Sequence, residues 1–210
     1  YYFGHLGTTV ALLPTPNAPK SYILAVADAR LGKELLENIN GNSIKNQLKA
    51  SLERLFVYRK FYPTAFDKEE AVLGMKIFDE LAMAYRHLKG FDNSKGKSVI
   101  NASNKAGNAL DTIVTKLAAE LHVPTVRLPA LYSDAPYGLV ADLTPALANM
   151  IVLGEDLILP DCLLPAFTDH TVKVLATFGF RVHYLPSATY HNMRGQIKLA
   201  TVSIPFHKDK

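Results

Sequence analysis

The sequence predicts a mixed α/β (α+β) protein built from repeated modules of two strands, a helix and a further strand. Strand-like segments come in pairs, and an amphipathic helix follows a pair before another strand returns. This ββαβ order is clear over Asn149–Leu185 and looser over Tyr1–Ala102. Apolar residues make up 49% of the 210 residues, which is enough to form a sizeable core.

The first module is expected to open with a hairpin. Tyr1–Leu13 is apolar and stops at a run of prolines, and Ser21–Asp28 is a second strand, so the link between them predicts a long loop. Leucine spacing then predicts helices over Leu31–Asn38 and Ser43–Tyr58, separated by a turn at Asn38–Asn42.

The strongest helical pattern covers Asp67–Leu88. Asp67 is a suitable N-cap, and Gly90 is placed to end the helix in the left-handed conformation that glycine tolerates. We expect the apolar side chains at helical spacing to face the core. They are Val72, Met75, Ile77, Phe78, Leu81 and Tyr85.

The middle of the chain is expected to alternate between loops and short elements. Phe91–Lys97 is polar and is predicted as a loop, and Ser98–Ala102 as a short strand. Asn108–His122 has an amphipathic helical pattern that Pro124 follows. Thr125–Leu131 is a strand candidate, and Tyr132–Gly138 is predicted as a loop.

The second module lies in the last third of the chain. Ala148–Gly154 is predicted as a buried strand, with Leu157–Leu159 as its hairpin partner. A helix is expected over Thr168–Phe178, capped by Thr168 or Asp169.

Composition excludes several classes of partner. The net charge is +4, and because Lys and Arg form no dense block, we expect no nucleic-acid partner. No apolar run has the about 18–20 residues of a membrane span, so no membrane partner is expected. Cys162 is the single cysteine and excludes an internal disulfide. No signal peptide is visible, and since the start resembles a strand interior, we expect a processed chain or a piece of a longer polypeptide.

Phe180–Leu185 and Gln196–Ile204 are predicted as the closing strands, and a turn before the last of them carries a resemblance. TYHNMRGQIKLAT is similar to the C-terminal catalytic segment of the peptidylarginine deiminases. The position of that family's nucleophilic Cys is Leu199, and the Gly that follows it is Ala200. The matching residues are Tyr190, His191, Gly195 and Thr201.

Two further blocks resemble the same family in the same order. Asn149–Gly154 is similar to the family's Asn-Met-Leu-Val-Leu-Gly strand, and Pro160 follows at about the family's spacing. Gly4-His5 resembles the start of its Gly-His-Val-Asp-Glu motif, and Leu12–Pro16 and Tyr22–Ala27 are similar to the strand and hairpin after that motif.

The resemblance implies a pentein fold, a five-bladed α/β propeller of ββαβ modules, of which residues 1–210 form about the C-terminal half. It therefore implies a partner, namely a second polypeptide, an N-terminal half or further copies of the chain. Exposed blade faces would otherwise leave large apolar patches in water. It implies no cofactor in this chain, calcium in the missing half and a cytoplasmic location, although the sequence itself indicates no compartment.

The resemblance also places the candidate site. His5 matches the family's catalytic His, Gly7 stands where its partner Asp should be, and Leu199 replaces the nucleophile. Deimination needs a thiolate and a carboxylate, so we expect a deiminase-like protein with an inactive site that acts in binding, structure or defence. The candidate binding residues are Tyr190, His191 and Arg194.

Two other functions stay open. The chain could complete an active calcium-dependent protein-arginine deiminase, which hydrolyses peptidyl-arginine to citrulline, or it could be an assembly subunit of a hetero-oligomer. Cys162 is expected to be inert packing rather than a substitute nucleophile, because no basic neighbour lowers its pKa.

Ordinary structural roles compete with the chemical ones at single residues. His5 fits a core or surface histidine, and Tyr190-His191 fits a hydrogen-bonded turn. Asp161 and Asp169 are expected to be solvated loop carboxylates, and Glu155-Asp156 is expected to form a turn rather than a metal site.

Overall fold

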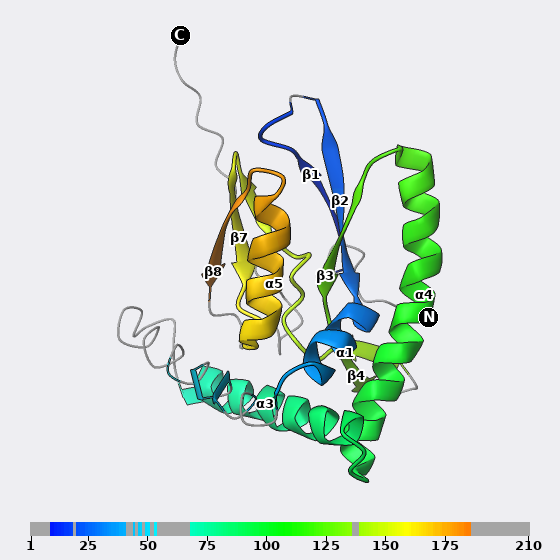
Figure 1. Cartoon of the computed structure of the whole chain (residues 1–210), viewed down its shortest axis with the longest axis vertical. Coiled ribbons are helices and arrows are strands. Elements are labelled where there is room, and N and C mark those ends of the chain that lie inside the picture. The colour runs from blue at the N-terminus through cyan, green and yellow to red at the C-terminus, as the bar shows by residue number, and fades with distance from the viewer. Residues whose placement is uncertain are drawn as a thin grey trace.

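The structure, a computed structural model, describes residues 9–18, 20–40, 68–135 and 139–185, together with residues 44, 46, 47, 49, 50 and 53. The described part contains helices α1, α3, α4 and α5 and three small sheets. Figure 1 shows helices lying beside the sheets, with α4 next to the sheet of β2 and β3 and α5 next to the sheet of β7 and β8. The mixed α/β class is therefore confirmed.

The first sheet has three strands in the order β1-β2-β3. They are β1 (Val10–Pro14), β2 (Tyr22–Asp28) and β3 (Thr125–Pro129). β1 and β2 pair antiparallel, whereas β3 runs parallel to β2. The predicted hairpin and the strand after the middle helix are thus confirmed from Val10 onward, and residues 1–8 lie outside the described part.

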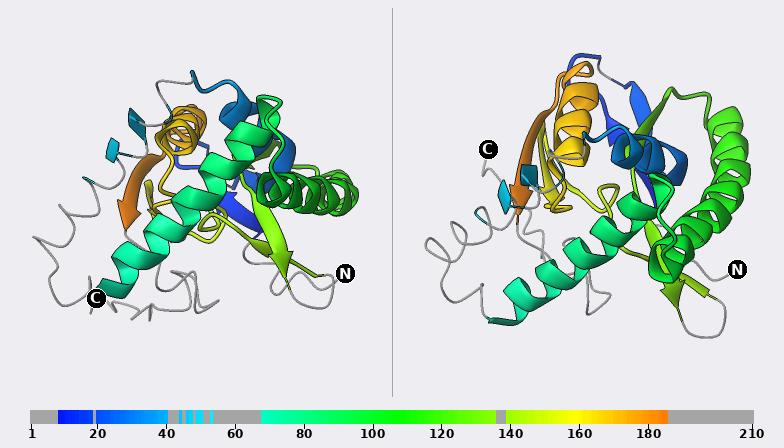
Figure 2. Two further views of the ribbon diagram at one scale, coloured as in Figure 1. Left: turned by 90° about the horizontal axis from the view of Figure 1, so that it is seen from below. Right: turned by 60° about the horizontal axis from the view of Figure 1, so that its bottom comes forward.

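Three helices lie between β2 and β3. They are α1 (Ala29–Glu37), α3 (Lys68–Leu88) and α4 (Ser94–Leu121). Figures 1 and 2 show α4 alongside the first sheet and α3 running below α1 and α5 to meet α4 at one end, so that the two long helices form an angle. Within the helix predicted over Ser43–Tyr58, the structure describes residues 44, 46, 47, 49, 50 and 53, and all of these are helical.

Helix α3 matches its prediction on most of its inner face. Ile77, Phe78, Leu81 and Tyr85 are buried as expected, but Met75 is 54% exposed and was wrongly assigned to the core. Asp67 and the side chain of Val72 lie outside the described part.

Gly90 ends α3 as predicted. Its φ is +86°, a value that L side chains rarely adopt. The Phe91 N–H donates to the Arg86 carbonyl at 3.0 Å, and the Gly90 N–H donates to the His87 carbonyl at 3.0 Å. These two bonds form a Schellman motif, which satisfies carbonyl groups that the helix end leaves open.

Helix α4 corrects two predictions. Phe91–Lys97 is not a loop beyond Asn93, and Ser98–Ala102 is helix rather than strand. The Asn93 side chain caps the helix by accepting a hydrogen bond from the Gly96 N–H at 3.0 Å. The buried residues then recur at helical spacing, including Val99, Ile100, Ala102, Ser103, Ala106 and Leu110.

The loop predicted over Tyr132–Gly138 is wrong at Tyr132–Ala135, and residues 136–138 lie outside the described part. β4 (Tyr132–Ala135) pairs antiparallel with β5 (Leu139–Asp142). Helix α4 anchors this ribbon, because the Tyr132 N–H donates to Ser103 Oγ at 3.0 Å and the Ser98 hydroxyl bonds the Asp134 carboxylate. The pairing therefore depends on contacts with α4 that no local pattern shows.

The second module repeats the first sheet's pairing. It comprises β6 (Ile151–Leu153), β7 (Asp156–Pro160), α5 (Pro165–Ala176) and β8 (Arg181–Leu185). β6 and β7 form an antiparallel hairpin, and β8 runs parallel to β7 after the helix. The ββαβ order predicted for this stretch is confirmed.

Two details of the second module differ from prediction. β6 is shorter than the predicted strand, and its last residue, Leu153, is 57% exposed rather than buried. Ala148 and Met150 are buried, but they lie before the strand begins. Helix α5 begins at Pro165, so neither Thr168 nor Asp169 is its cap. Proline is favoured at the first helical position because its φ is preset and it has no N–H to satisfy.

The largest buried cluster joins both modules. It contains Leu13 and Ile23 from the first sheet, Leu128 from β3, and Leu157 and Phe167 from the second module. A separate cluster of small residues lets α4 pack closely on the other side. Its members are Ala27, Ala29, Ala102, Ala106, Leu110, Ala130 and Tyr132. The strand predicted over Gln196–Ile204 lies outside the described part.

Candidate functional site

The residues assigned to the site from the sequence all lie outside the described part. They are His5, Gly7, Tyr190, His191, Arg194 and Leu199. Their roles therefore stay predictions. The described residues contain four features that could bear on function, and three of them are polar groups at the ends of strands.

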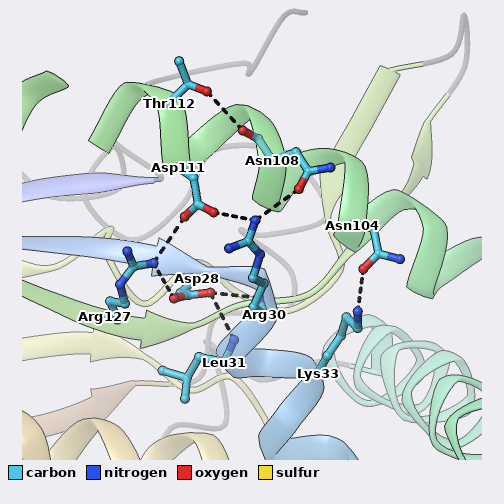
Figure 3. Close-up of polar contacts among 9 residues, drawn as sticks. All are labelled: Asp28, Arg30, Leu31, Lys33, Asn104, Asn108, Asp111, Thr112 and Arg127. Carbon is cyan, nitrogen blue, oxygen red and sulfur yellow. Dashed lines mark hydrogen bonds and ion pairs between the residues drawn. The ribbon is translucent and has the colours of Figure 1, made fainter. Parts of the chain in front are cut away.

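The first feature is Asp28, the last residue of β2. Its carboxylate is only 8% exposed, and Oδ1 accepts hydrogen bonds from the Arg30 N–H at 2.8 Å and the Leu31 N–H at 3.0 Å. Aspartate is a favoured N-cap because its oxygen satisfies backbone groups that the first turn leaves open. Figure 3 shows it at the start of α1, facing β3.

Arg127 on β3 binds the other oxygen of this carboxylate. Its Nη1 lies 2.7 Å from Asp28 Oδ2 and 3.3 Å from Asp111 Oδ1 on α4. The hydrogen bond to Asp28 is the main cause that raises the pKa of Arg127, and Asp111 adds to it. The guanidinium thus links two carboxylates from different elements.

Arg30 completes the Asp28 cluster, defined as Asp28, Arg30, Asp111 and Arg127. Arg30 Nη2 lies 2.8 Å from Asp111 Oδ2 and also donates to Asn108 Oδ1 at 3.3 Å. Two guanidinium groups face two carboxylates, so the cluster is balanced in charge. It is suited to fastening α4 to the sheet and to α1 rather than to acid–base chemistry.

The second feature is a hollow of about 570 Å³ between the two modules. It is lined by Asp28 at the end of β2, by Arg30, Leu31 and Glu34 of α1, by residues 125–127 of β3, by His170 of α5 and by Phe178 just after α5. Asp28, Arg30 and Arg127 therefore belong both to the Asp28 cluster and to the wall of this hollow. Its volume falls within the range of about 300–1,000 Å³ that is common for ligand sites. No local pattern in the sequence predicts this hollow, because its walls come from three separate segments.

The third feature is the loop from β7 to α5, where Asp161 was expected to be solvated. That expectation is wrong, because Asp161 is 1% exposed, while Asp169 is exposed as predicted. Asp161 Oδ1 accepts a hydrogen bond from the Leu163 N–H at 2.8 Å, and the Asp161 N–H donates to the Leu185 carbonyl at 2.7 Å. Leu163 has a φ of +66°, an unusual value for a bulky residue.

Cys162 lies in the same loop and is 0% exposed. Its Sγ lies 3.8 Å from the Leu164 carbonyl oxygen. Nearby, burial raises the pKa of the Tyr184 hydroxyl, with Cys162 and Asp161 as smaller causes. The Tyr184 hydroxyl donates to the Thr168 carbonyl at 3.1 Å. The Cys162 thiol is therefore enclosed by the protein and has no surface in contact with solvent.

The fourth feature is an exposed ion-pair cluster on the second sheet. Arg181 binds Asp156 through both carboxylate oxygens, at 2.9 and 2.8 Å, and Arg181 Nη1 lies 2.7 Å from Glu155 Oε1. His183 Nε2 lies 2.8 Å from Asp156 Oδ1. Hydrogen bonds from Arg181 and then His183 hold the pKa of Asp156 well below its usual range.

This arrangement corrects part of the predicted turn. Glu155 lies in the turn, but Asp156 already opens β7 and stands opposite Arg181 in the parallel register. The cluster therefore fixes how β7 and β8 align. Within the described part, no three His, Cys, Asp or Glu side chains come together as a metal site. None of the described helices is long and apolar enough to cross a membrane.

Sequence reasoning missed the Asp28 cluster for a clear reason. A local signal existed at Asp28, an acidic residue between a buried strand and a helix, but its partner Arg127 lies 99 residues further on. Comparison with protein-family models and with curated proteins gives no match for this chain.

Proposed function

We propose that the chain is a deiminase-like protein that binds its ligand without catalysing deimination, as part of a larger α/β propeller. The burial of Cys162 carries this proposal. Deimination of arginine needs a thiolate that reaches the guanidinium carbon, and the chain has only this one cysteine. A thiol with no exposed surface cannot meet a substrate from solution.

The repeated ββαβ module supports the part of the proposal that concerns the fold. Both modules pair their strands first antiparallel and then parallel around a helical crossover. In each, an aspartate follows or ends the second strand and accepts a hydrogen bond from the N–H two residues on, namely Asp28 and Asp161. Asp28 caps α1, whereas Asp161 bonds within the loop before α5, so the likeness is confined to the strand ends. Similar strand ends are expected of blades in one propeller.

The substrate class comes from the resemblance at Tyr190, His191 and Arg194, so the proposed ligand is an arginine side chain in a peptide. The binding energy of such a site can persist when the nucleophile is lost, because fold and chemistry separate readily. The propeller would be completed by a second polypeptide, an N-terminal half or further copies of the chain, with calcium held outside this chain.

The test is citrulline release from a capped peptide with one internal arginine, with and without calcium. We expect no citrulline, and we expect calorimetry to detect binding of that peptide more strongly than of its lysine counterpart. Leu199→Cys serves as a gain-of-thiol variant, and iodoacetamide should label its new cysteine in the native protein.

The matched control for labelling is the wild type, whose Cys162 should react only after unfolding in urea. Citrulline production by the wild type, abolished in Cys162→Ser, would overturn the proposal and make Cys162 a nucleophile. Citrulline production that Cys162→Ser leaves intact would favour an active complex in which another chain supplies the thiol.

A further inference from the structure

The part of the Asp28 cluster that lines the hollow exposes its cations more than its anions. Asp28, Arg30 and Arg127 all belong to this wall. The side chain of Asp28 is 8% exposed, whereas those of Arg30 and Arg127 are 64% and 49% exposed. Although the cluster as a whole is balanced in charge, its guanidinium groups are therefore the part that meets solvent.

The hydrogen bonds of the cluster use its acceptors fully but leave donors free. Both carboxylate oxygens of Asp28 and both of Asp111 are bonded. Arg127 makes its contacts through Nη1 alone, and Arg30 through Nη2 alone, as Figure 3 shows. A guanidinium carries five N–H donors in one plane. Within the described part, Nε and the second terminal nitrogen of each arginine are thus free to bind a carboxylate.

Glu34 adds an acidic group to the same hollow. It lies four residues after Arg30 on α1, and residues four apart share one face of a helix. Arg30 is directed toward Asp111 and Asn108 on α4 instead. Glu34 is exposed and has no ion-pair partner among the residues that the structure describes. The hollow therefore offers free N–H donors and, one helical turn away, an unpaired carboxylate.

Much of the remaining wall is apolar. Leu31 of α1, Val174 of α5 and Phe178 just after α5 line the hollow, and each is partly buried. His170 of α5 adds one polar group. A volume of about 570 Å³ suits a small molecule, and such sites combine apolar walls with a few placed polar groups.

We infer that this hollow binds a small zwitterion, namely an amino acid with an apolar side chain. Its carboxylate would accept charge-assisted hydrogen bonds from Arg30 and Arg127, and its ammonium group would pair with Glu34. Its side chain would contact Leu31 and Phe178. A simple anion would meet repulsion from Glu34, and a simple cation would meet repulsion from the guanidinium groups. The inference uses none of the residues of the arginine site proposed above and does not depend on that proposal.

The test titrates the full ¹⁵N-labelled chain with L-leucine and with two analogues that each lack one charge. Isocaproate keeps the side chain and the carboxylate, and isoamylamine keeps the side chain and the amine. We expect leucine to shift the Nε–H resonances of Arg30 and Arg127. Each analogue should bind about threefold more weakly, as expected for the loss of one exposed charge pair. No shift at either arginine, or equal binding of either analogue, would overturn the inference. Inorganic phosphate that binds as tightly as leucine would also overturn it, because the site would then be a general anion site.

Variants of two glutamates on α1 isolate the contact with the ammonium group. Glu34→Gln should weaken leucine binding by about threefold without weakening isocaproate binding. Glu37→Gln, on the same helix but outside the hollow, should leave both affinities unchanged. Both glutamates are exposed, so we expect both variants to fold. Equal losses of leucine and isocaproate binding in Glu34→Gln, or equal effects of the two variants, contradict the inference.

Arg127→Lys isolates the contact with the carboxylate. It keeps a positive charge beside Asp28 but removes the planar fork of donors. Leucine and isocaproate should both bind more weakly to this variant, whereas isoamylamine binding should not change. An Arg127→Lys variant that binds leucine as the wild type does would show that the guanidinium does not hold the carboxylate, and would count against the inference.

Discussion

At the scale of single residues, the two aspartates at strand ends show how far local sequence can lead. The cap at Asp28 follows from an acidic residue between a strand and a helix, but its ion pair with Arg127 depends on a strand that the chain reaches much later. The burial of Asp161 could not be predicted, because it depends on the end of β8 covering the loop. The residues with assigned chemical roles lie outside the described part, so their predictions stand untested.

Asp156 gives a prediction about pH. Its pKa is lowered in the folded state, so its charged form stabilises the fold above the unfolded pKa of about 3.9, and this stabilisation is lost as the pH falls below it. We expect Asp156→Asn to melt slightly below the wild type at pH 7, and we expect the gap to close towards pH 2. The effect should shrink in high salt, because the cluster is exposed.

Thermal unfolding followed by circular dichroism from pH 7 to pH 2 would measure this effect. Asp169→Asn is the matched control, since Asp169 is also exposed in the second module but lies outside this cluster. If both variants follow the wild-type pH profile in parallel, the Asp156 cluster does not contribute to stability.

At the scale of elements, the start of α4 was the main error of prediction, and the residues there show why it arose. Val99 and Ile100 are strand formers in a short window, and they favoured a strand over Ser98–Ala102. Contacts with α3 and with the first sheet decide between helix and strand, since the buried residues of α4 recur at helical spacing from Gly96 to Val114. Elements whose residues pack locally, such as the β1–β2 hairpin and α3, were predicted well.

Two glycines of α4 test this helix. A Cβ at Gly96 would lie 2.2 Å from the Met83 carbonyl oxygen, so Gly96→Ala should destabilise the protein by about 1–3 kcal/mol through overpacking. A Cβ at Gly107 would lie 3.5 Å from the Ala29 Cβ, an ordinary contact. Gly107→Ala should therefore stabilise by about 0.5–1 kcal/mol through higher helix propensity.

Urea unfolding of the two variants and the wild type would measure both changes. The two substitutions are the same and lie on the same helix, but Gly96 is in the first turn and Gly107 in the interior. The opposite signs are expected from the space beside each glycine. A Gly96→Ala variant at least as stable as the wild type would show that α3 and α4 do not approach each other closely at Gly96.

At the scale of the whole molecule, the repeat of modules was foreseen, but their packing was not. Periodicity predicts strands and helices, and the order of elements predicts a ββαβ unit. It does not show that α5 of one module packs against β3 of the other, or that a hollow remains between them. Such contacts join segments that no pattern in the sequence connects.

The proposed propeller predicts a larger assembly. The chain has a mass of 23.1 kDa, and we expect native mass spectrometry of the isolated material to give a higher value. Denaturing conditions should then release either a second polypeptide or identical chains. A single 23.1 kDa species under both conditions contradicts the proposal that other chains complete the propeller.

The parallel strand pairs of the two modules enclose very different lengths of chain. The Asp156–Arg181 pair spans 25 residues, whereas the Asp28–Arg127 pair spans 99, because α3 and α4 lie inside the first crossover. Closing the longer loop costs about 1 kcal/mol more in chain entropy, and contacts between distant residues form more slowly. The shorter crossover favours early pairing of β7 with β8, whereas β3 can join β2 only once the long segment that contains α3 and α4 has closed.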